Sequence, residues 1–558
     1  ESFVAGDCRW PARVCDGELH GGCGGYRASI LCRWLEVDEA RFVALALLMA
    51  LVVGCGGFGV GGYSDVRIEN VTLRMPSTDA QPASIIFDIA WENSFRDDLN
   101  WDAVWVFVKF HEPGQPWRHA GISPAPSAHR IGENNGVLAT LTPSEDGRGI
   151  FLHRADTGFS SIDWDQVSLS WPLIGDGVAR STSVEIEVIA LQMVNIPEGP
   201  FMVGDGTTVE ALVAAQFERG VSQQSFEISS EAAITLGGGG ENSLGNHDRR
   251  VSSSTSQQFW DDFSNETKQT LPDEFPKGFR SFYVMKNELT QGDYAHFLNL
   301  IDPSQQGTRN PAPSVPVGEG HRYAISSSAE FRVMPYNRAA NWLSWMDVAA
   351  FADWSGLRPM SELEFEKAAR GDRYPNPGEF AWGPEVPPAG KYVLQDEDTP
   401  EELIPNQATG ANVAFDGTIG LESSVSGPLR ASAFVPLATS RLSFGGSYYR
   451  VTEMSGNVAE MVVTVGRSAG RRYQGRHGDG ELSPAGNAAG EEVEWWPGAR
   501  RSARGGYEVL NADGIGTRGG DWTFGIGRLR VSDREDINKP ADHRGMRWGG
   551  RLVRSVDR

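Results

Sequence analysis

Cysteine is missing from most of this chain. All five cysteines lie within the first 55 residues (Cys8, Cys15, Cys23, Cys32 and Cys55), and residues 56–558 contain none. This cysteine-free body therefore cannot contain a disulfide framework, a thiolate metal site or a cysteine nucleophile.

Positive charge is also scarce. Asp and Glu number 73 against 50 Lys and Arg, which gives a net charge of −23. Nucleic-acid binders neutralise backbone phosphates with Lys and Arg, so this balance disfavours that class of protein. We expect no nucleic-acid partner.

Long hydrophobic runs are absent, and the longest apolar stretch is 13 residues. Residues 42–54 read FVALALLMALVVG and follow Arg41. A membrane-spanning helix needs about 20 residues, whereas this length suits a signal peptide. The stretch ends at Val52-Val53-Gly54-Cys55, which resembles a bacterial lipobox. A Gly-extended transmembrane anchor and a chance apolar run are the alternatives.

The lipobox interpretation predicts where the mature protein begins. Residues 1–54 would be an upstream segment plus the signal peptide, and Cys55 would carry the lipid. The Gly-rich residues 55–62 would form a flexible tether. We therefore expect an exported protein, lipid-anchored in the bacterial cell envelope or at its surface.

Residues 63–191 predict an all-β domain. Short runs that largely alternate apolar and polar residues are separated by turn residues, at 66–73, 84–91, 103–110, 149–153, 166–171 and 183–191. Such spacing is typical of a β-sandwich, most simply an immunoglobulin-like one. We expect Trp101, Trp105 and Trp117 to pack in the core or at an edge rather than to bind a ligand.

Residues 192–558 predict a mixed α+β domain with few short helices and much irregular structure. Helix starts are signalled at Thr290, which is a candidate N-cap residue, and at Ser344 and Ser361, which are followed three residues later by Asp347 and Glu364. The last two match the capping-box pattern, and an apolar stripe follows each of the three starts. Residues 236–266 are rich in Gly, Ser and Asn and are predicted to be a long surface insertion.

Six blocks of this second domain resemble, in order, the formylglycine-generating-enzyme-like (sulfatase-modifying factor) family. They begin with MVNIPEGPFMVG at Met193 and FYVMKNELTQGDYAHF at Phe282. LSWMDVAAFADWSGLRPMSELEFEKAARG at Leu343 and FAWG at Phe380 follow. The last are EMSGNVAE at Glu453 and RGGDW at Arg518, with Arg528, Arg530 and Arg534 after it. The resemblance covers about residues 193–554 and implies a C-type-lectin-like fold.

The same resemblance argues against the family's best-known activity. Its enzymes carry two copper-binding cysteines just after the Gly-Gly-Ser, and here those positions fall on or near Phe524 and Leu529, with Asp521 in place of the serine. Cu(I) requires soft sulfur ligands, which neither residue supplies. We therefore expect no copper and no catalytic residue of that kind. The family's active-site groove would run past Asp521, Trp522 and Arg528.

Iron is not expected either. The family's iron-dependent branch uses a His-rich motif, and neither H-x-x-x-H-x-E nor H-E-x-x-H occurs in this sequence. His111 and His119 lie eight residues apart in the β-rich region. They are predicted to be solvated loop residues rather than ligands.

Calcium is the cofactor that the resemblance still implies. The family's structural Ca²⁺ would use the side chains of Glu453 and Glu460 and the carbonyls of Gly456 and Val458. A related site would use the Asn412 side chain and the Val413 carbonyl. Calcium favours six to eight oxygen ligands, so two carboxylates on a Gly-containing turn are suitable. The alternative is that Glu453 and Glu460 bond only to the backbone or to an arginine such as Arg450.

Arginines concentrate near the C-terminus, at positions 518, 528, 530, 534, 544, 547, 551 and 554. They would form either an anion-binding groove or internal pairs with carboxylates that brace a loop-rich domain. The resemblance favours internal pairing, because several of them match framework positions of the family.

Three functions follow as hypotheses. The first is an envelope lipoprotein whose sulfatase-modifying-factor-like domain is a binding or structural module for an envelope protein or glycan. The second is an enzyme of this superfamily, oxidoreductase-like or of the non-haem iron type, with an unrecognised mechanism. The third is a self-assembling envelope component.

Overall fold

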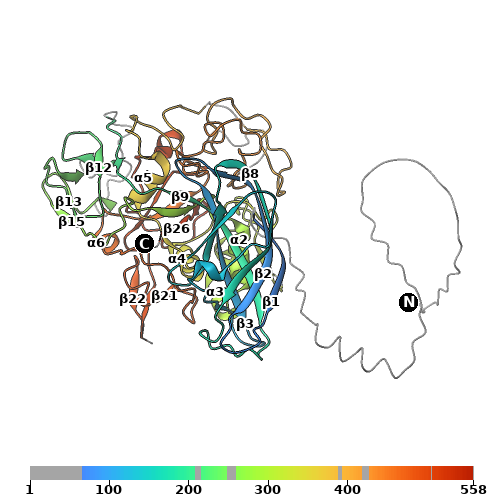
Figure 1. Cartoon of the computed structure of the whole chain (residues 1–558). Helices are drawn as coiled ribbons and strands as arrows, with labels where there is room; N and C mark the ends of the chain where they lie inside the picture. The colour runs from blue at the N-terminus through green and yellow to red at the C-terminus, as the bar shows by residue number, and fades with distance from the viewer. Residues whose placement is uncertain are drawn as a thin grey trace, which may run out of the picture. The chain divides into compact units, whose positions relative to one another are not determined.

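The structure, a computed structural model, describes residues 66–207, 215–247, 259–327, 329–387, 392–416, 426–503 and 505–556 (Figure 1). All described residues belong to the unit Gly57–Arg558. The predicted signal peptide, Cys55 and the tether lie outside them. Within the described residues, no helix is long and apolar enough to cross a bilayer.

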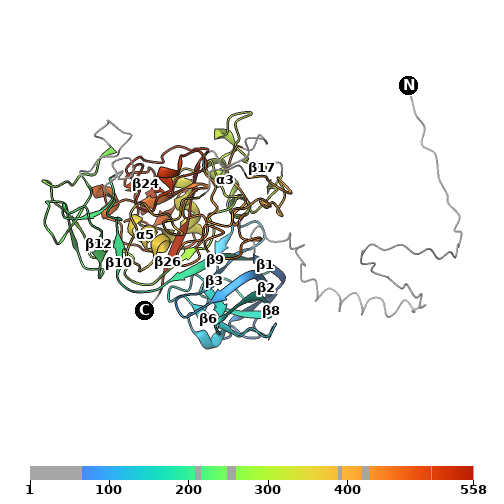
Figure 2. The ribbon, with the colours of Figure 1, turned by 90° about the horizontal axis from the view of Figure 1, so that it is seen from above.

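The N-terminal β domain consists of two packed sheets (Figure 2). One sheet has the order β1 (Val66–Arg74), β2 (Ala83–Arg96), β8 (Gly158–Trp171) and β5 (Glu133–Asn134). The other contains β3 (Asp102–His111), β7 (Ile150–Arg154), β6 (Ala139–Pro143) and β4 (Arg118–His119). Alternate residues of β2 are buried, so one face of each strand contributes to a shared core. This confirms the predicted β-sandwich.

Strand β9 (Glu185–Ile196) joins the β domain to the second domain. It pairs with β3 from Glu185 to Val194 and with β16 (Phe282–Met285) from Met193 to Ile196. The eight-stranded sheet continues through β16 into β26 (Leu552–Ser555) and β19 (Arg358–Pro359). The predicted boundary between residues 191 and 192 therefore lies inside one continuous strand.

Strand β3 is buried on both faces, which explains its nearly continuous apolar sequence. Val104, Val106 and Val108 face the core of the sandwich, whereas Trp105 and Phe107 belong to the core of the second domain. The Trp105 indole is fully buried and donates to the Ser355 carbonyl at 2.9 Å. The expectation that Trp105 packs rather than binds a ligand is confirmed.

The three predicted helices are present: α2 (Gln291–Asn299), α4 (Trp345–Trp354) and α5 (Glu362–Arg370). At α5, the Ser361 hydroxyl accepts from the Glu364 amide at 3.1 Å, and the Ser361 amide donates to the Glu364 carboxylate at 2.9 Å. Two further helices, α3 (Pro303–Arg309) and α6 (Ser468–Arg471), were not predicted. The start of α3 carries its own capping box between Asp302 and Gln305, with proline at the first helical position.

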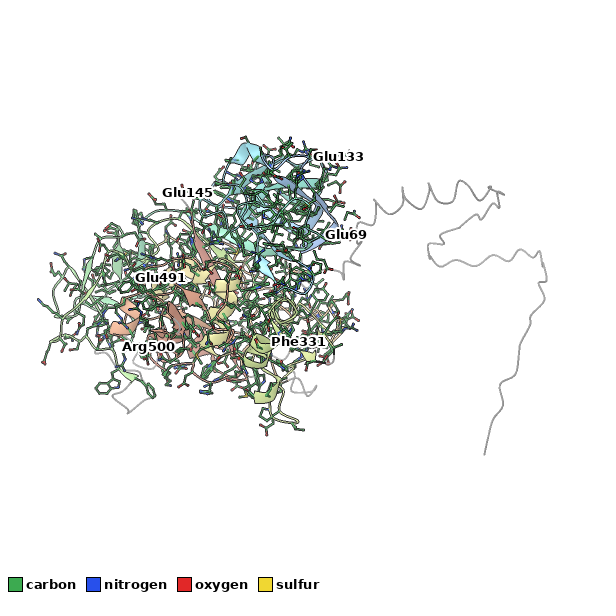
Figure 3. All side chains as sticks on the ribbon, turned by 90° about the horizontal axis from the view of Figure 1, so that it is seen from below. Glu69, Glu133, Glu145, Phe331, Glu491 and Arg500 are labelled. Carbon is green, nitrogen blue, oxygen red and sulfur yellow. The ribbon has the colours of Figure 1, made fainter. Side chains whose placement is uncertain are left out.

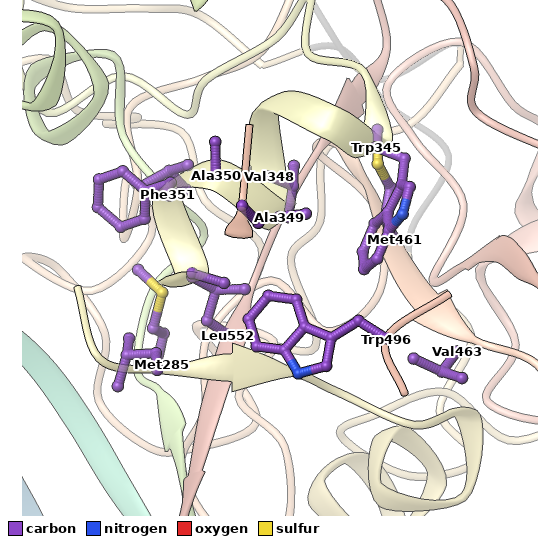
Figure 4. Close-up of a cluster of buried hydrophobic side chains, with 14 of the residues drawn as sticks. Met285, Trp345, Val348, Ala349, Ala350, Phe351, Met461, Val463, Trp496 and Leu552 are labelled. Carbon is purple, nitrogen blue, oxygen red and sulfur yellow. The ribbon is translucent and has the colours of Figure 1, made fainter. Parts of the chain in front are cut away.

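Helix α4 covers the centre of the second domain. Figure 4 shows Trp345 of α4 close to Met461, and Trp496 near Leu552 of β26. All four side chains are buried. This apolar core supports the strands that carry the candidate site: β20 (Ala459–Val463), β24 (Ile515–Arg518) and β25 (Trp548–Gly549), in the order β24-β20-β25.

The stretch predicted as a surface insertion is partly core. A small sheet has the order β11 (Glu218–Arg219), β14 (Ser243–Gly245), β13 (Ile234–Leu236) and β15 (Gln269–Leu271). Leu236, Leu244 and Phe263 are fully buried. The prediction of a surface insertion is therefore wrong for these described parts of residues 236–266. Scattered apolar residues in this Gly-rich segment pack into the core.

The remaining strands are short. They are β10 (Phe201–Val203) with β12 (Phe226–Ile228), β17 (Ser326–Ser327) with β18 (Phe331–Arg332), and the order β21 (Ala489–Gly490), β23 (Tyr507–Val509), β22 (Ala499–Arg501). Exposed acidic side chains lie around the outside, among them Glu69, Glu133 and Glu491 (Figure 3).

Candidate functional site

The turn from Glu453 to Glu460 leads into strand β20 and is tightly wound. Glu453, Gly456 and Asn457 all have positive φ values, of 49°, 87° and 62°. A Cβ at Gly456 would lie 2.4 Å from the Ala414 carbonyl oxygen, so only glycine fits there. The Asn457 amide donates to that same carbonyl at 2.9 Å. The turn and the loop that follows Asn412 are thus brought together.

In each of the two carboxylates of this turn, only one oxygen accepts a hydrogen bond. One Glu453 oxygen accepts from the Ser432 amide at 2.9 Å, and one Glu460 oxygen accepts from Arg551 Nε at 2.7 Å. Both side chains are at least nine-tenths buried, and the second oxygen of each has no hydrogen-bond partner in the described part of the chain. Two buried oxygens therefore remain to bind another group.

Glu288 is a third buried carboxylate that the sequence analysis missed. It accepts from Asn457 Nδ2 at 2.5 Å and from the Val458 amide at 3.0 Å, so both its oxygens hold the turn in place. Burial, with Glu453 nearby, raises its pKa well above the usual range. Its sequence signal was its position inside the FYVMKNELT block, directly before the predicted start of α2.

The charges of this cluster do not balance. Burial also raises the pKa of Glu453, and raises that of Glu460 to about 7 even though Arg551 opposes the shift. Arg551 opposes the pKa shift at all three carboxylates and Arg430 does so at Glu453, yet the pKa of each stays raised, because burying their negative charge is costly. A hard divalent cation would supply the missing positive charge and use the two free oxygens. The residues present therefore fit calcium.

Carbonyl oxygens would have to complete such a site. Within the described ranges, no three His, Cys, Asp or Glu side chains are grouped so as to hold a metal ion. Glu288 is already occupied by the turn, so the ligands would be Glu453, Glu460 and carbonyls such as those of Gly456 and Val458. This calcium site stays a prediction.

The Asn412 side chain is fully engaged by the protein. Its amide oxygen accepts from the Tyr392 hydroxyl at 3.1 Å and from the Ala408 amide at 2.8 Å, and its nitrogen donates to three carbonyls. This arrangement leaves no free side-chain oxygen at Asn412. The second calcium site, with the neighbouring Val413 carbonyl, also stays a prediction.

Asp521 and Trp522 of the predicted groove lie directly beside the turn. The Trp522 amide donates to the Asn457 carbonyl at 2.9 Å. One oxygen of the fully buried Asp521 accepts from the Thr523 amide at 2.8 Å, and the other lies 3.9 Å from Arg547 Nε. That second oxygen and the Trp522 indole nitrogen are both buried without a hydrogen-bond partner among the described residues. Burial raises the pKa of Asp521.

Apolar groups fill the two positions at which the resemblance places cysteines. The Phe524 ring lies near two guanidiniums, at 4.6 Å from Arg528 and 4.5 Å from Arg547. Leu529 is fully buried and packs in a cluster with Phe380 and Trp382. Neither position has a group that can bind copper or attack a substrate.

Arg528 is also engaged within its own segment. Its guanidinium pairs with Glu535 and Asp536, and Asp533 lies 3.9 Å away. It is therefore anchored by neighbouring carboxylates and faces the Phe524 ring as well.

The C-terminal arginines are mostly paired inside the protein. Arg518 bonds to Glu362 and Glu366 at 3.0 and 2.7 Å, and Arg534 reaches Glu362 and Asp261 at 2.7 and 2.8 Å. The others with close carboxylate partners are Arg544 with Asp347, Arg551 with Glu460, and Arg554 with Asp146. Of the two interpretations, the geometry supports internal pairing rather than an anion groove.

The two histidines of the β domain differ from each other. His111 is paired with Glu185 at 2.9 Å at the end of β3. His119 is buried in β4, stacks on Phe107 and bonds to the Arg148 carbonyl at 2.6 Å. The expectation of a solvated loop residue is wrong for His119, because the second domain covers this face of the sheet.

Three comparisons with known proteins bear on the family of this chain. No curated protein matches the chain significantly. Among solved structures, Treponema denticola variable protein 1 matches at 11% identity with a TM-score of 0.27, over 66% of this chain and 96% of that one. The profile of the sulfatase-modifying factor enzyme 1-like (FGE-sulfatase) domain family matches residues 239–556. Since that match spans more than half of the sequence, the chain belongs to the sulfatase-modifying factor enzyme 1-like family.

Proposed function

We propose that this protein is a cell-envelope lipoprotein whose sulfatase-modifying-factor-like domain is a binding and structural module rather than a thiol-oxidising enzyme. The observation that carries the proposal is the filling of the two expected cysteine positions. Phe524 lies near Arg528 and Arg547, and Leu529 is buried in an apolar cluster. Residues 56–558 contain no cysteine that could substitute.

The anchor follows from the N-terminal sequence. The 13-residue apolar run ends in Val52-Val53-Gly54-Cys55, and residues 56–62 are rich in glycine. Lipid on Cys55 would hold the module at the membrane, and the tether would let it reach an envelope protein or glycan. Calcium at the Glu453–Glu460 turn would be structural, with no copper or iron.

Two measurements on the full chain test the proposal. Incubation with a cysteine-containing peptide, copper and a reductant should give no aldehyde product by mass spectrometry. In bacterial cells labelled with a palmitate analogue, the label should be incorporated and Cys55→Ser should abolish it. Catalytic turnover of the peptide thiol would refute the module, and labelling that survives Cys55→Ser would refute the anchor.

An enzyme with a different mechanism is the alternative, and one observation favours it. The second oxygen of Asp521 and the indole nitrogen of Trp522 are buried, adjacent in sequence and without hydrogen-bond partners in the described structure. Buried polar groups left unpaired in this way often mark a site that binds another group. Near-stoichiometric iron or copper in purified protein would support the enzyme, whereas calcium alone would support the module.

Self-assembly of the module at the cell envelope is a further possibility that the proposal includes. Analytical ultracentrifugation of the full chain in detergent distinguishes a self-assembling component from a single-chain module, because the former gives particles much larger than one chain.

A further inference from the structure

A cavity of about 520 Å³ opens between helix α6 and the edge of the small sheet that contains β13 and β15. Figure 1 shows these three elements next to one another. The polar side chains that line the cavity come from all three elements and the residues beside them: Thr235, Lys268, Gln269, Thr270, Ser468, Arg471 and Arg472. It lies apart from the residues of the candidate site described above.

The charged residues that line this cavity are all basic. Lys268, Arg471 and Arg472 contribute to its wall, and no described carboxylate does. In a chain with a net charge of −23, such a concentration of one sign is unusual. A cavity with basic walls favours an anion, because the wall charges raise its local concentration and bind it directly.

One of the three cations is already neutralised and fixes the wall. Arg471 forms a two-pronged pair with Asp262, at 2.7 and 2.9 Å, and a bond to the Val465 carbonyl at 2.8 Å. Lys268 and Arg472 are exposed, and neither forms an ion pair or hydrogen bond with any described residue. Within the described part of the chain, these two side chains are therefore available to a ligand.

Hydroxyl groups stand between the cations. Thr235 and Thr270 are directly opposite each other on the antiparallel strands β13 and β15, so their side chains share one face of the sheet. Ser468 is exposed at the first turn of α6. Three hydroxyls that can donate and two free cations are the groups that bind the oxygens of a phosphate or sulfate.

The glycine-rich run beside β13 leaves room for Lys268. Gly238 has a φ of 75°, and a Cβ there would lie 2.3 Å from Lys268 Cε. The aliphatic part of the lysine therefore lies against the bare backbone of Gly238. Glycine at this position sets the course of the side chain toward the cavity.

We propose that this cavity is an oxyanion site that binds the phosphate or sulfate group of a small polar molecule. Lys268 and Arg472 would pair with the anion, and Thr235, Thr270 and Ser468 would donate hydrogen bonds to its remaining oxygens. Arg471, held by Asp262, would form the rigid back of the site. The inference goes beyond the proposed module and depends neither on lipid anchoring nor on calcium.

Isothermal titration calorimetry of the full chain at low ionic strength tests the site, with sodium phosphate, sodium sulfate and glucose 6-phosphate as probes. Lys268→Gln combined with Arg472→Gln should weaken binding by at least about tenfold, since two charge-assisted contacts are lost. The matched control combines Arg67→Gln with Arg332→Gln, which removes two exposed arginines elsewhere and should leave the affinity unchanged. Thr235→Val combined with Thr270→Val should weaken binding without any change in net charge.

The probes distinguish the source of the anion. Tighter binding of glucose 6-phosphate than of phosphate supports an ester carried on a sugar-sized molecule, and equal binding supports a free anion. The proposal is overturned if none of the three probes binds. It is overturned equally if the control pair weakens binding as much as the cavity pair, because the effect would then be general charge screening.

Discussion

Calcium at the Glu453–Glu460 turn should make two similar substitutions behave in opposite ways. Glu453→Gln removes a buried negative charge that has an unbonded oxygen, so without calcium it should leave stability unchanged or raise it. Glu460→Gln leaves the fully buried Arg551 without its carboxylate. That loss should cost about 3–5 kcal/mol with or without calcium.

The expected size of the calcium effect follows from the few ligands available. Two carboxylates with backbone carbonyls suggest a Kd of about 0.1 mM, in the range of extracellular calcium modules. At about 10 mM calcium, binding to the folded state alone would stabilise it by about 2.7 kcal/mol. The entropy of unfolding of a unit of roughly 500 residues is about 1 kcal/mol/K, so Tm should rise by about 3 °C.

Differential scanning calorimetry in calcium, in EDTA and in magnesium at equal ionic strength measures this shift. The unsubstituted protein should gain about 3 °C in calcium, with little gain in magnesium. Glu453→Gln should gain nothing. A calcium shift in Glu453→Gln equal to that of the unsubstituted protein would refute the reasoning, and so would no shift in the unsubstituted protein.

Three other substitutions test the buried charges and the joint between the domains. Burial lowers the pKa of Lys109 to about 7, so between pH 7 and 10 the unfolded chain binds more protons than the folded one. The free energy of unfolding should therefore rise with pH in that window, and Lys109→Met should flatten this rise when it is measured by urea unfolding. An unchanged dependence of the unfolding free energy on pH in the variant would contradict the assignment. Glu362→Gln should lower the free energy of unfolding by about 3–5 kcal/mol, because Arg518 and Arg534 both bond to Glu362. As a control, the exposed Glu133→Gln should change it by less than about 0.5 kcal/mol. Similar urea midpoints for the two variants would show that the pairs contribute little. The unsubstituted protein should unfold in one calorimetric transition because Trp105 joins the two cores, and Trp105→Ala should cost about 3–5 kcal/mol; two separated transitions in the unsubstituted protein would show that the domains are not coupled there.

Local patterns in the sequence predicted several longer strands of the β domain and three of the helices, but not the short strands of the second domain. The alternation at 84–91 placed β2, and the N-cap candidate Thr290 with the capping boxes at Ser344 and Ser361 placed three helices, because these signals depend only on neighbouring residues. Local sequence patterns did not predict how strand β9 pairs. Its pairing with β3 on one half and with β16 on the other depends on residues far away in the chain.

The candidate site was predicted only in part, for a similar reason. The resemblance placed Glu453, Glu460 and Asp521, and the structure brings these segments together around Asn457. It could not indicate that Glu288 holds the turn, since that contact joins residues 169 and 170 positions apart. The burial of Leu236, Leu244 and Phe263 could not be predicted because the local pattern around them is uninformative. Single apolar residues inside Gly-, Ser- and Asn-rich text show no period that predicts a core.

The geometry around Asn457 indicates how the predicted calcium turn and the segment that carries Phe524 would be coupled. The Asn457 side chain binds Glu288 and its carbonyl accepts from the Trp522 amide, so one residue joins the turn to the segment that carries Phe524. A cation that fixed the turn would therefore also fix the position of Trp522. In a binding module this coupling would order the surface near Asp521 without any chemistry there. Calcium should then alter the fluorescence of Trp522, measured as the difference between the unsubstituted protein and Trp522→Phe. A calcium response that is identical in both proteins would show that the turn and the segment are independent.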